Sequence, residues 1–220
     1  MGVSVVTGAN RGLGLELARQ LKARGANVVA VCRNSSPKLD ALGVRVEGGI
    51  DVTEPAAGSA LAQRLAGDDI ELLIHNAGVL IEDSLDNLDA DNVRAQFEVN
   101  AIAPLFLTRA LAPRLRPGAK VALITSRMGS IGDNGSGGYF GYRMSKAALN
   151  AAGVSLARDL KPRGIAVVML HPGAVRTEMT GGHGMIEVDE AVRGLLQRID
   201  ELRLETTGRF LHQSGDVLPW

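Results

Sequence analysis

The segment Val3-Ser-Val-Val-Thr7-Gly8-Ala-Asn-Arg-Gly12-Leu-Gly14 is the strongest single indication of the fold. A short apolar run leads into a glycine-rich turn, and Leu17 and Leu21 then begin a helical pattern. Glycine lets the backbone turn sharply at this point and come close to a ligand. Backbone N–H groups and the helix dipole favour an anion at the start of such a helix. The segment therefore predicts a strand, a phosphate-binding turn and a helix.

Strand and helix patterns alternate along the rest of the chain with short connections. Predicted strands cover residues 3–7, 26–32, 44–47, 71–75, 121–125, 165–170 and 209–211. Predicted helices follow the glycine turn and cover residues 56–65, 88–115, 139–160 and 188–202, with Pro117-Gly118 closing the one over 88–115. The strands are continuously apolar, which is typical of a parallel sheet covered by helices on both faces. We expect one doubly wound α/β (Rossmann) domain over residues 1–220, with about seven mostly parallel strands.

The unusual residues of the chain lie at the carboxyl ends of these strands. They are Gly8–Gly14, Arg33, Asp51, Asn76–Gly78, Ser126 and Pro172–Thr177. In doubly wound sheets, ligands bind beyond this edge. The sequence therefore predicts one ligand site to which several loops contribute.

Composition narrows the class of protein. Lys plus Arg and Asp plus Glu both number 24, so no bulk charge indicates nucleic acid or a membrane surface as a partner. The single cysteine, Cys32, cannot form an internal disulfide, which suits a reducing compartment. Asn10 and Arg11 interrupt the N-terminal apolar run, and no run is long enough to span a bilayer. We expect a cytoplasmic protein without nucleic-acid or membrane partners.

Tyr142 and Lys146 are candidate catalytic residues. They are four residues apart in the helix predicted over 139–160, so their side chains share one face. A free tyrosine has a pKa of about 10, and a nearby ammonium group makes its proton available closer to neutral pH. Ser126 directly follows the strand over 121–125 and could hold the oxygen that the tyrosine protonates.

The glycine turn and the end of the second strand predict a dinucleotide. The spacing Gly8-x-x-x-Gly12-x-Gly14 is neither G-x-G-x-x-G nor a P-loop. Arg33 follows the second strand, where an NAD site carries Asp or Glu, and Arg11 lies inside the glycine turn. Two guanidinium groups would suit the 2′-phosphate of NADP, although both arginines could instead be solvated surface cations. We expect NADP(H) in preference to NAD(H).

The motifs resemble those of the short-chain dehydrogenase/reductase family along nearly the whole chain. In order, they are Thr7-Gly-x-x-x-Gly-x-Gly14, Asn76-Ala-Gly78, Asn100, Ser126, Tyr142-x-x-x-Lys146 and Pro172-Gly173. The stretch that begins at Ser126 and the ending Leu-Pro-Trp220 are similar to one subgroup, the small carbonyl reductases related to the fly protein sniffer and to bacterial C-factor proteins.

The resemblance implies a role for each matching residue. Tyr142 would be the acid/base, Lys146 would lower its pKa and bind the nicotinamide ribose, and Ser126 would orient the substrate carbonyl. Asn100 would belong to a water-linked proton relay through Lys146. The implied cofactor-binding residues are Gly8, Asn10, Arg11, Gly12, Leu13, Gly14, Arg33, Asp51, Val52, Asn76, Ala77, Gly78, Tyr142, Lys146, Pro172, Gly173, Val175 and Thr177.

Three features depart from the family pattern. The spacing from Ser126 to Tyr142 is three residues longer than usual, so Ser130 is a rival for the serine role, although we prefer Ser126 because it follows the strand. His75 replaces the first Asn of Asn-Asn-Ala-Gly. The segment over 177–188, where the family has a substrate lid, is short and glycine-rich, which predicts a small lid and an open site.

These features together predict an NADPH-dependent enzyme that reduces aldehydes and ketones to alcohols, with a small carbonyl compound as substrate. The alternative is a C-factor-like signalling or interaction protein that binds the dinucleotide as a ligand. His75, His171, His183 and His212 lack the spacing of metal ligands, so we expect no metal site. We expect one helix face to be mainly core, the face with Phe97, Ile102, Leu105 and Phe106. Small neighbouring residues would suit helix packing between subunits of a homodimer or homotetramer; they are Ala147, Ala148 and Ala151.

Overall fold

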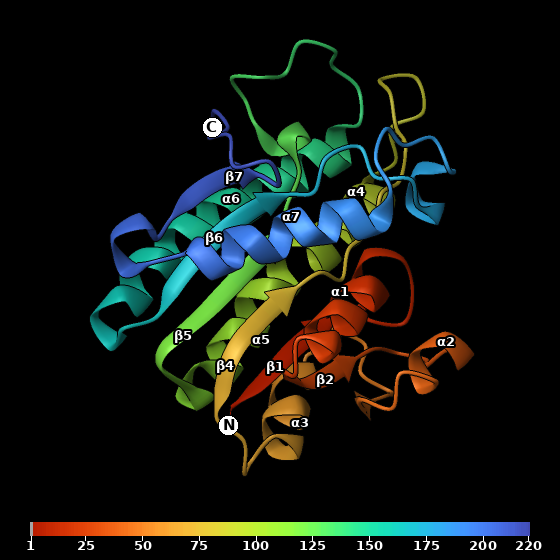
Figure 1. Ribbon diagram of the computed structural model, residues 1–220. Helices are drawn as coiled ribbons and strands as arrows, with labels where there is room; N and C mark the ends of the chain where they lie inside the picture. The colour runs from red at the N-terminus through yellow and green to blue at the C-terminus, as the bar shows by residue number, and fades with distance from the viewer. Residues whose placement is uncertain (1) are drawn as a thin grey trace.

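The predicted strands pair side by side in one parallel sheet in the computed structural model, which describes residues 2–220 (Figure 1). The strands are β1 (Val3–Thr7), β2 (Asn27–Val31), β3 (Arg45–Glu47), β4 (Ile70–His75), β5 (Leu115–Ile124), β6 (Ala166–His171) and β7 (Arg209–His212). Their order is β3-β2-β1-β4-β5-β6-β7, and every adjacent pair runs parallel. This confirms the predicted single doubly wound domain.

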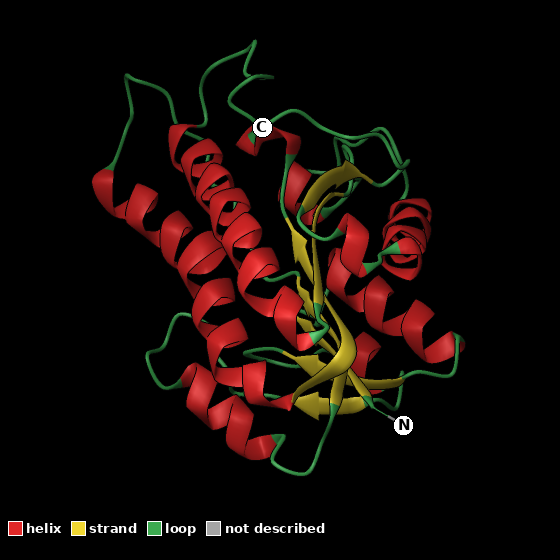
Figure 2. Ribbon diagram, turned by 90° about the vertical axis from the view of Figure 1, so that its left-hand side faces the viewer, coloured by secondary structure: helices red, strands yellow, loops and turns green. Residues whose placement is uncertain are grey.

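Helices cover both faces of the sheet, which Figure 2 shows between two helical layers. One face is covered by α3 (Ala57–Arg64), α5 (Ala103–Leu111) and α6 (Phe140–Leu160). The other is covered by α1 (Gly12–Ala23), α7 (Val188–Glu201) and the short α2 (Pro37–Asp40). The remaining α-helix of residues 2–220, α4 (Ala90–Phe97), joins α5 through a π-helical turn at Glu98–Ile102 and packs against α6.

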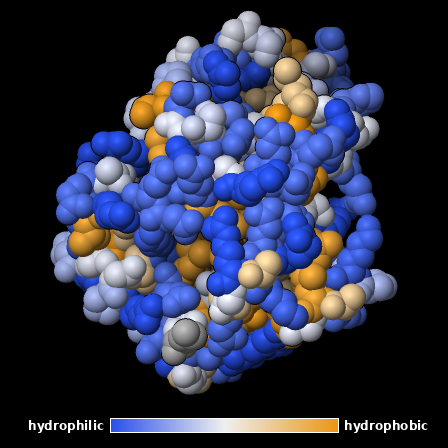
Figure 3. Space-filling view, viewed as in Figure 1, coloured by the Kyte–Doolittle hydropathy of each residue, from blue (hydrophilic) through white to orange (hydrophobic). Residues whose placement is uncertain are grey.

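The two helical layers explain why the strands are continuously apolar. In β5, Val121 and Leu123 enter the core beneath α3, α5 and α6, whereas Ala122 and Ile124 enter the core beneath α1 and α7. Side chains alternate along a strand, so a sheet buried on both faces needs apolar residues at every position. Each fully buried Val, Leu or Ile side chain contributes roughly 1.5–3 kcal/mol to folding. On the outside, the face seen in Figure 1 is mainly hydrophilic, with small hydrophobic patches among the hydrophilic residues (Figure 3).

The region between β4 and β5 differs from its prediction. The helix predicted over 88–115 ends at Leu111, because Pro113 lacks an N–H group and disfavours helix at the preceding residue. β5 then begins at Leu115, and its register with β4 shifts before Lys120. Pro117-Gly118 therefore lies within this irregular part of β5 and does not end a helix.

Two further predictions about helices were wrong. Sequence reasoning missed α2, although Ser36 caps it through a hydrogen bond from Leu39 N and Pro37 occupies its first position. The face with Ile102, Leu105 and Phe106 was expected to be mainly core, but the Phe106 side chain is 55% exposed. The residues of α5 that enter the core are instead Leu107 and Leu111.

His75 ends β4 as a neutral side chain buried in the core. The residue is 2% exposed, and Nε2 lies 2.8 Å from Thr108 Oγ1. The Thr108 hydroxyl donates to Pro104 O at 2.7 Å, so it accepts its second hydrogen bond from the His75 Nε2–H group. Burial lowers the pKa of His75 to about 3, because the protonated ring would lose its hydration.

We predict that His75 makes the protein less stable in mild acid. Below about pH 6.5 the unfolded histidine binds a proton, whereas the folded ring stays neutral until about pH 3, so protons favour unfolding across this window. At pH 5 the cost is about 2 kcal/mol relative to pH 7. Urea unfolding of wild type and His75→Asn at both pH values tests this, since only wild type should lose that increment. An equal loss in both proteins would contradict it.

Candidate active site

A cavity of about 1330 Å³ lies beyond the carboxyl ends of the central strands. β1 and β4 are neighbours there, and the chain leaves them toward opposite faces of the sheet, which makes a topological switch point. The volume of the cavity exceeds that of a typical pocket for a drug-sized ligand. All the predicted site residues line the cavity except Gly14 and Asn100.

The glycine turn after β1 has the backbone needed for close approach of an anion. Gly8 and Gly12 have positive φ of 66° and 52°, in the left-handed region that favours glycine. A Cβ on Gly8 would lie 2.8 Å from Ala77 Cα, so a larger residue would push the turn away from β4. The first turn of α1 holds no acidic side chain, so its positive end is free for a phosphate. This cradle fits the diphosphate of a dinucleotide.

Side chains at the ends of β1 and β4 fix the shape of this turn. The Asn76 amide donates to the carbonyls of Thr7 and Gly8 at 3.0 and 3.1 Å. The Thr7 hydroxyl accepts from the backbone N–H groups of Asn76 and Ala77, both at 3.1 Å. Gly14 contributes by packing, because a Cβ there would overlap the Gly8 carbonyl. Asn76 therefore supports the turn and also lines the cavity, whereas Gly14 supports the turn without lining the cavity.

The two arginines predicted at the adenosine end both line the cavity and both face carboxylates. Arg33 Nη1 lies 3.7 Å from Asp51 Oδ2, and Arg11 Nη1 lies 2.7 Å from Glu178 Oε2. Each arginine side chain is 71% exposed. The pKa of Asp51 is lowered, mainly by hydrogen bonds from Thr53 and to a smaller extent by Arg33. Both guanidinium groups are therefore solvated cations at the cavity, each beside a carboxylate.

Tyr142 and Lys146 lie in the first turns of α6 and meet Ser126 at the cavity wall. All three residues line the cavity and are otherwise buried. Lys146 Nζ lies 5.7 Å from the centre of the Tyr142 ring and donates to Ile124 O at 2.9 Å. The rival Ser130 is buried away from the cavity, where its hydroxyl accepts from Asp133 N. The placement of the two serines supports Ser126.

Burial dominates the acid–base properties of this pair. It raises the pKa of Tyr142 to about 12, with the nearby Ser126 hydroxyl acting in the opposite direction. It lowers the pKa of Lys146 to about 8, because the ammonium form loses its hydration. The resemblance implies a lowered pKa for Tyr142, and in the protein alone the direction is the reverse. The low-dielectric wall favours the neutral form of both side chains.

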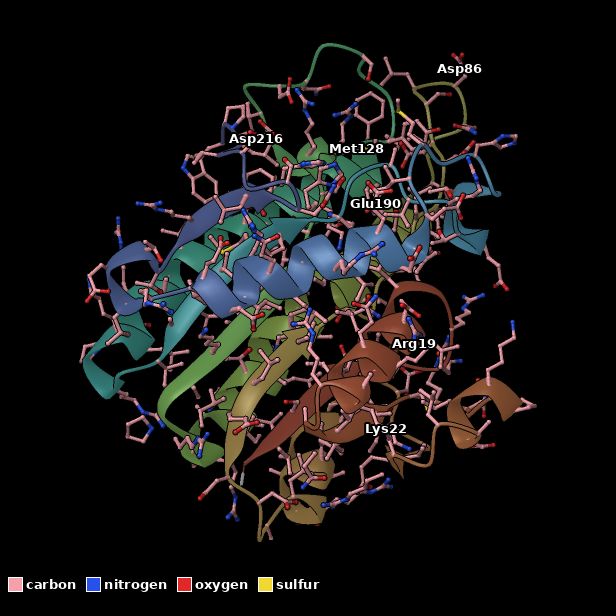
Figure 4. The ribbon with its side chains drawn as sticks, in the orientation of Figure 1. Arg19, Lys22, Asp86, Met128, Glu190 and Asp216 are labelled. Atoms are coloured by element: carbon pink, nitrogen blue, oxygen red, sulfur yellow. The ribbon has the colours of Figure 1, made fainter. Side chains whose placement is uncertain are left out.

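The long loop between Ser126 and Tyr142 is tied down by Arg143, a residue that sequence reasoning missed. Its guanidinium donates to Gly138 O at 3.0 Å, to Ser136 Oγ at 2.8 Å and to Met128 O at 3.4 Å. Met128 lies beside the start of α6 (Figure 4). Arg143 therefore connects both ends of the loop to the helix that carries Tyr142. Only its position next to Tyr142 could have signalled this role.

Asn100 lies behind the cavity wall, in the π-helical turn between α4 and α5. Its Oδ1 accepts from Val79 N at 2.9 Å, and its Nδ2 donates to Val79 O at 2.8 Å and to Ser145 Oγ at 3.0 Å. These bonds connect the loop after β4 to α6. The part of Asn100 in a proton relay stays a prediction.

Residues outside the predicted set of catalytic and cofactor-binding residues also line the cavity. Arg127, Met128, His171 and Met179 line it together with the predicted set. The pKa of His171 is lowered to about 4, first by burial and then by the nearby positive charges. Within residues 2–220, no three His, Cys, Asp or Glu side chains are placed to hold a metal ion. No helix in the same range is long and apolar enough to cross a membrane.

Comparison with known proteins identifies the family. The model of the short chain dehydrogenase family matches residues 2–185. The chain belongs to this family. It is therefore an oxidoreductase of the short-chain dehydrogenase class, with the Rossmann fold that the sequence predicted.

Two relatives are each 43% identical to this chain. One is the 1-hydroxy-2-glutathionyl-2-methyl-3-butene dehydrogenase of Rhodococcus sp. (strain AD45), over 100% of both chains. The other is the C-signal protein of Myxococcus xanthus, over 73% of this chain and 99% of that protein.

Solved structures of carbonyl reductases share the fold over the whole chain. Carbonyl reductase Sniffer of D. melanogaster is 28% identical, with a TM-score of 0.91 and full coverage of both chains. The NADPH-bound carbonyl reductase from chicken fatty liver is 32% identical, with a TM-score of 0.89 over 100% of this chain and 99% of that one. The predicted resemblance to sniffer-like carbonyl reductases and C-factor proteins is confirmed, and the bound NADPH in one neighbour supports a nicotinamide dinucleotide cofactor.

Proposed function

We propose that the protein is an NADPH-dependent short-chain oxidoreductase that reduces aldehyde and ketone carbonyls to alcohols. The observation that carries this is the meeting of Ser126, Tyr142 and Lys146 at the wall of a cavity whose other end is a phosphate cradle. A module that only binds a dinucleotide, as the C-factor alternative requires, has no need of a buried tyrosine beside a buried lysine.

The side chains of the site would act on the carbonyl oxygen. NADPH, when bound, supplies the hydride for the carbonyl carbon. Ser126 donates a hydrogen bond to the oxygen as negative charge develops there, and Tyr142 transfers its proton to it. With a pKa of about 12, Tyr142 is protonated before the reaction and is ready to act as the acid. Lys146 stabilises the tyrosinate that is left.

The proposed direction of the reaction is reduction. Reduction starts from the neutral phenol, which burial stabilises, whereas alcohol oxidation needs the tyrosinate as a base. The Rhodococcus relative is named as a dehydrogenase of a hydroxy compound. We assign this chain to the reductive direction, with a small carbonyl compound as substrate and the cytoplasm as its compartment.

The cofactor would extend from the glycine turn to the ends of β5 and β6. Gly8, Asn10, Gly12 and Leu13 would hold the diphosphate, while Asp51 and Val52 would contact the adenine. The remaining contacts would come from Asn76, Ala77 and Gly78 at the adenosine ribose, from Tyr142 and Lys146 at the nicotinamide ribose, and from Pro172, Gly173, Val175 and Thr177 at the carboxamide end.

We predict that Tyr142→Phe lowers carbonyl-dependent NADPH oxidation by roughly 10²–10⁴-fold, because the proton donor is lost while the ring remains. NADPH affinity should stay within about twofold, since the phosphate cradle is untouched. Steady-state rates with a broad panel of aldehydes and ketones, and NADPH titration by fluorescence, measure the two effects. Tyr139→Phe is the matched control, because this tyrosine lies outside the cavity wall. A wild type inactive on every carbonyl, or a fully active Tyr142→Phe, would refute the proposal.

We predict that Arg33→Asp lowers the preference for NADPH over NADH by about tenfold or more, because a carboxylate would replace the cation at the 2′-phosphate. The ratio of kcat/KM for the two cofactors measures it. Lys38→Asp makes the same charge change at an exposed position of α2 outside the cavity, and should leave the ratio unchanged. If Arg33→Asp leaves the ratio unchanged as well, Arg33 does not select the cofactor.

A homodimer or homotetramer would cover the apolar face between α5 and α6. Ile102, Leu105, Phe106 and Met144 are all exposed large hydrophobic residues. Phe106→Glu should shift the protein to a smaller species in sedimentation velocity, because a carboxylate would be buried against an apolar partner surface. Leu85→Glu, at an exposed residue of the loop between β4 and α4, should not. A monomeric wild type would exclude this assembly.

A further inference from the structure

The helix that carries Tyr142 begins without a cap of its own. α6 starts at Phe140, and its N-cap residue Tyr139 makes no side-chain capping bond. Tyr139 has a φ of 53°, and no other non-glycine residue within 2–220 has a positive φ. The left-handed conformation costs a residue with a side chain roughly 1–2 kcal/mol. The first turn also lacks an acidic side chain, so its N–H groups need partners from elsewhere.

Asp83, from the loop between β4 and α4, supplies these partners. Its backbone carbonyl accepts from Tyr139 N at 3.0 Å. One carboxylate oxygen accepts from Phe140 N, and the other accepts from Gly141 N at 2.9 Å. Three successive N–H groups therefore converge on one residue, which is only 8% exposed. A carboxylate at this end of a helix also interacts favourably with the helix dipole.

The loop that carries Asp83 is itself held against α4. Gln96 is fully buried, and its Oε1 accepts from Ile81 N at 3.0 Å. On the other side, a Cβ on Gly141 would overlap Gln96 Nε2 and would lie 3.1 Å from Asp83 Oδ2. Glycine at 141 thus lets the start of α6 seat directly on Asp83 and α4. Tyr142 is the next residue, so its position follows from this contact.

We infer that Asp83 is a positioning residue that sets where Tyr142 stands in the active site. It does not line the cavity and does not touch the reacting atoms. It acts through the backbone of Tyr139, Phe140 and Gly141, and holds the left-handed turn that aims α6 at the end of β5. This role rests on the proposed carbonyl reduction, because it concerns the acid of that reaction.

Asp83→Asn separates positioning from general stability. The amide keeps one acceptor oxygen but places an NH₂ group against a backbone N–H, so the start of α6 loses a bond. A displacement of about 1 Å in a reacting group can cost about 10²-fold in rate. We expect kcat per folded molecule to fall by about 10–100-fold. NADPH affinity should stay within about twofold, because the phosphate cradle lies after β1.

The matched control is Asp86→Asn, which removes an exposed carboxylate from the outer tip of the same loop (Figure 4). Hydrogen exchange should show faster exchange of the Phe140 and Gly141 amides in Asp83→Asn and no change in Asp86→Asn. Adding Tyr139→Gly to Asp83→Asn should recover part of the protection and of kcat, since glycine adopts a positive φ without strain. The double variant also gives a folded protein for measurement if Asp83→Asn is poorly stable.

Three results would overturn the inference. The amides could exchange as in wild type, or they could exchange faster while kcat stays at the wild-type value. The third is an Asp83→Asn protein in which kcat and NADPH affinity fall together, which indicates a general loss of structure. If wild type itself reduces no carbonyl, the proposed function fails and this role with it, whereas an active wild type with an unchanged Asp83→Asn rejects the role alone.

Discussion

The candidate active site depends on how backbone polar groups at the carboxyl edge of the sheet find partners. Parallel strands all end at this edge, and the loops beyond it carry N–H and C=O groups that no ladder satisfies. Side chains from distant segments satisfy them: Asn76 bonds the turn after β1, Lys146 bonds the end of β5, and Asn100 bonds the loop after β4. Each bond also places a residue at the cavity. The requirement for hydrogen bonds and the assembly of the site are therefore one constraint.

The loop between Ser126 and Tyr142 is subject to the same constraint, for its backbone carbonyls and for its backbone N–H groups. Arg143 donates to carbonyls along the loop, and Asp83 accepts from the N–H groups where the loop becomes α6. A donor-only side chain and an acceptor-only side chain thus hold opposite kinds of backbone group. The loop is glycine-rich and none of residues 127–139 belongs to the two hydrophobic cores, so polar bonds such as these two sets hold it in place.

Burial gives the pair Tyr142 and Lys146 its chemical character. The same packing that excludes water raises the pKa of the phenol and lowers that of the ammonium group. Both groups therefore rest closer to their neutral forms than they would in solvent, and any charge that a substrate or cofactor brings acts in a weakly screened environment. Lys146 keeps one hydrogen bond to Ile124 O, which fixes its amine beside the tyrosine ring.

The sequence alone determined the fold class and brought most of the predicted site residues to one cavity, for physical reasons. Continuous apolar strands between amphipathic helices have few alternatives to a doubly wound sheet, and parallel strands bring every strand-end motif to one edge. Tertiary structure alone decided what depends on contacts distant in sequence. It placed Ser126 rather than Ser130 at the cavity and exposed Phe106. The packed protein also raises the pKa of Tyr142, where the resemblance implied a lowered one, because burial depends on tertiary packing. Finally, the fold brings Asp83 to the start of α6 across 57 residues of chain, and no local sequence pattern could signal this contact.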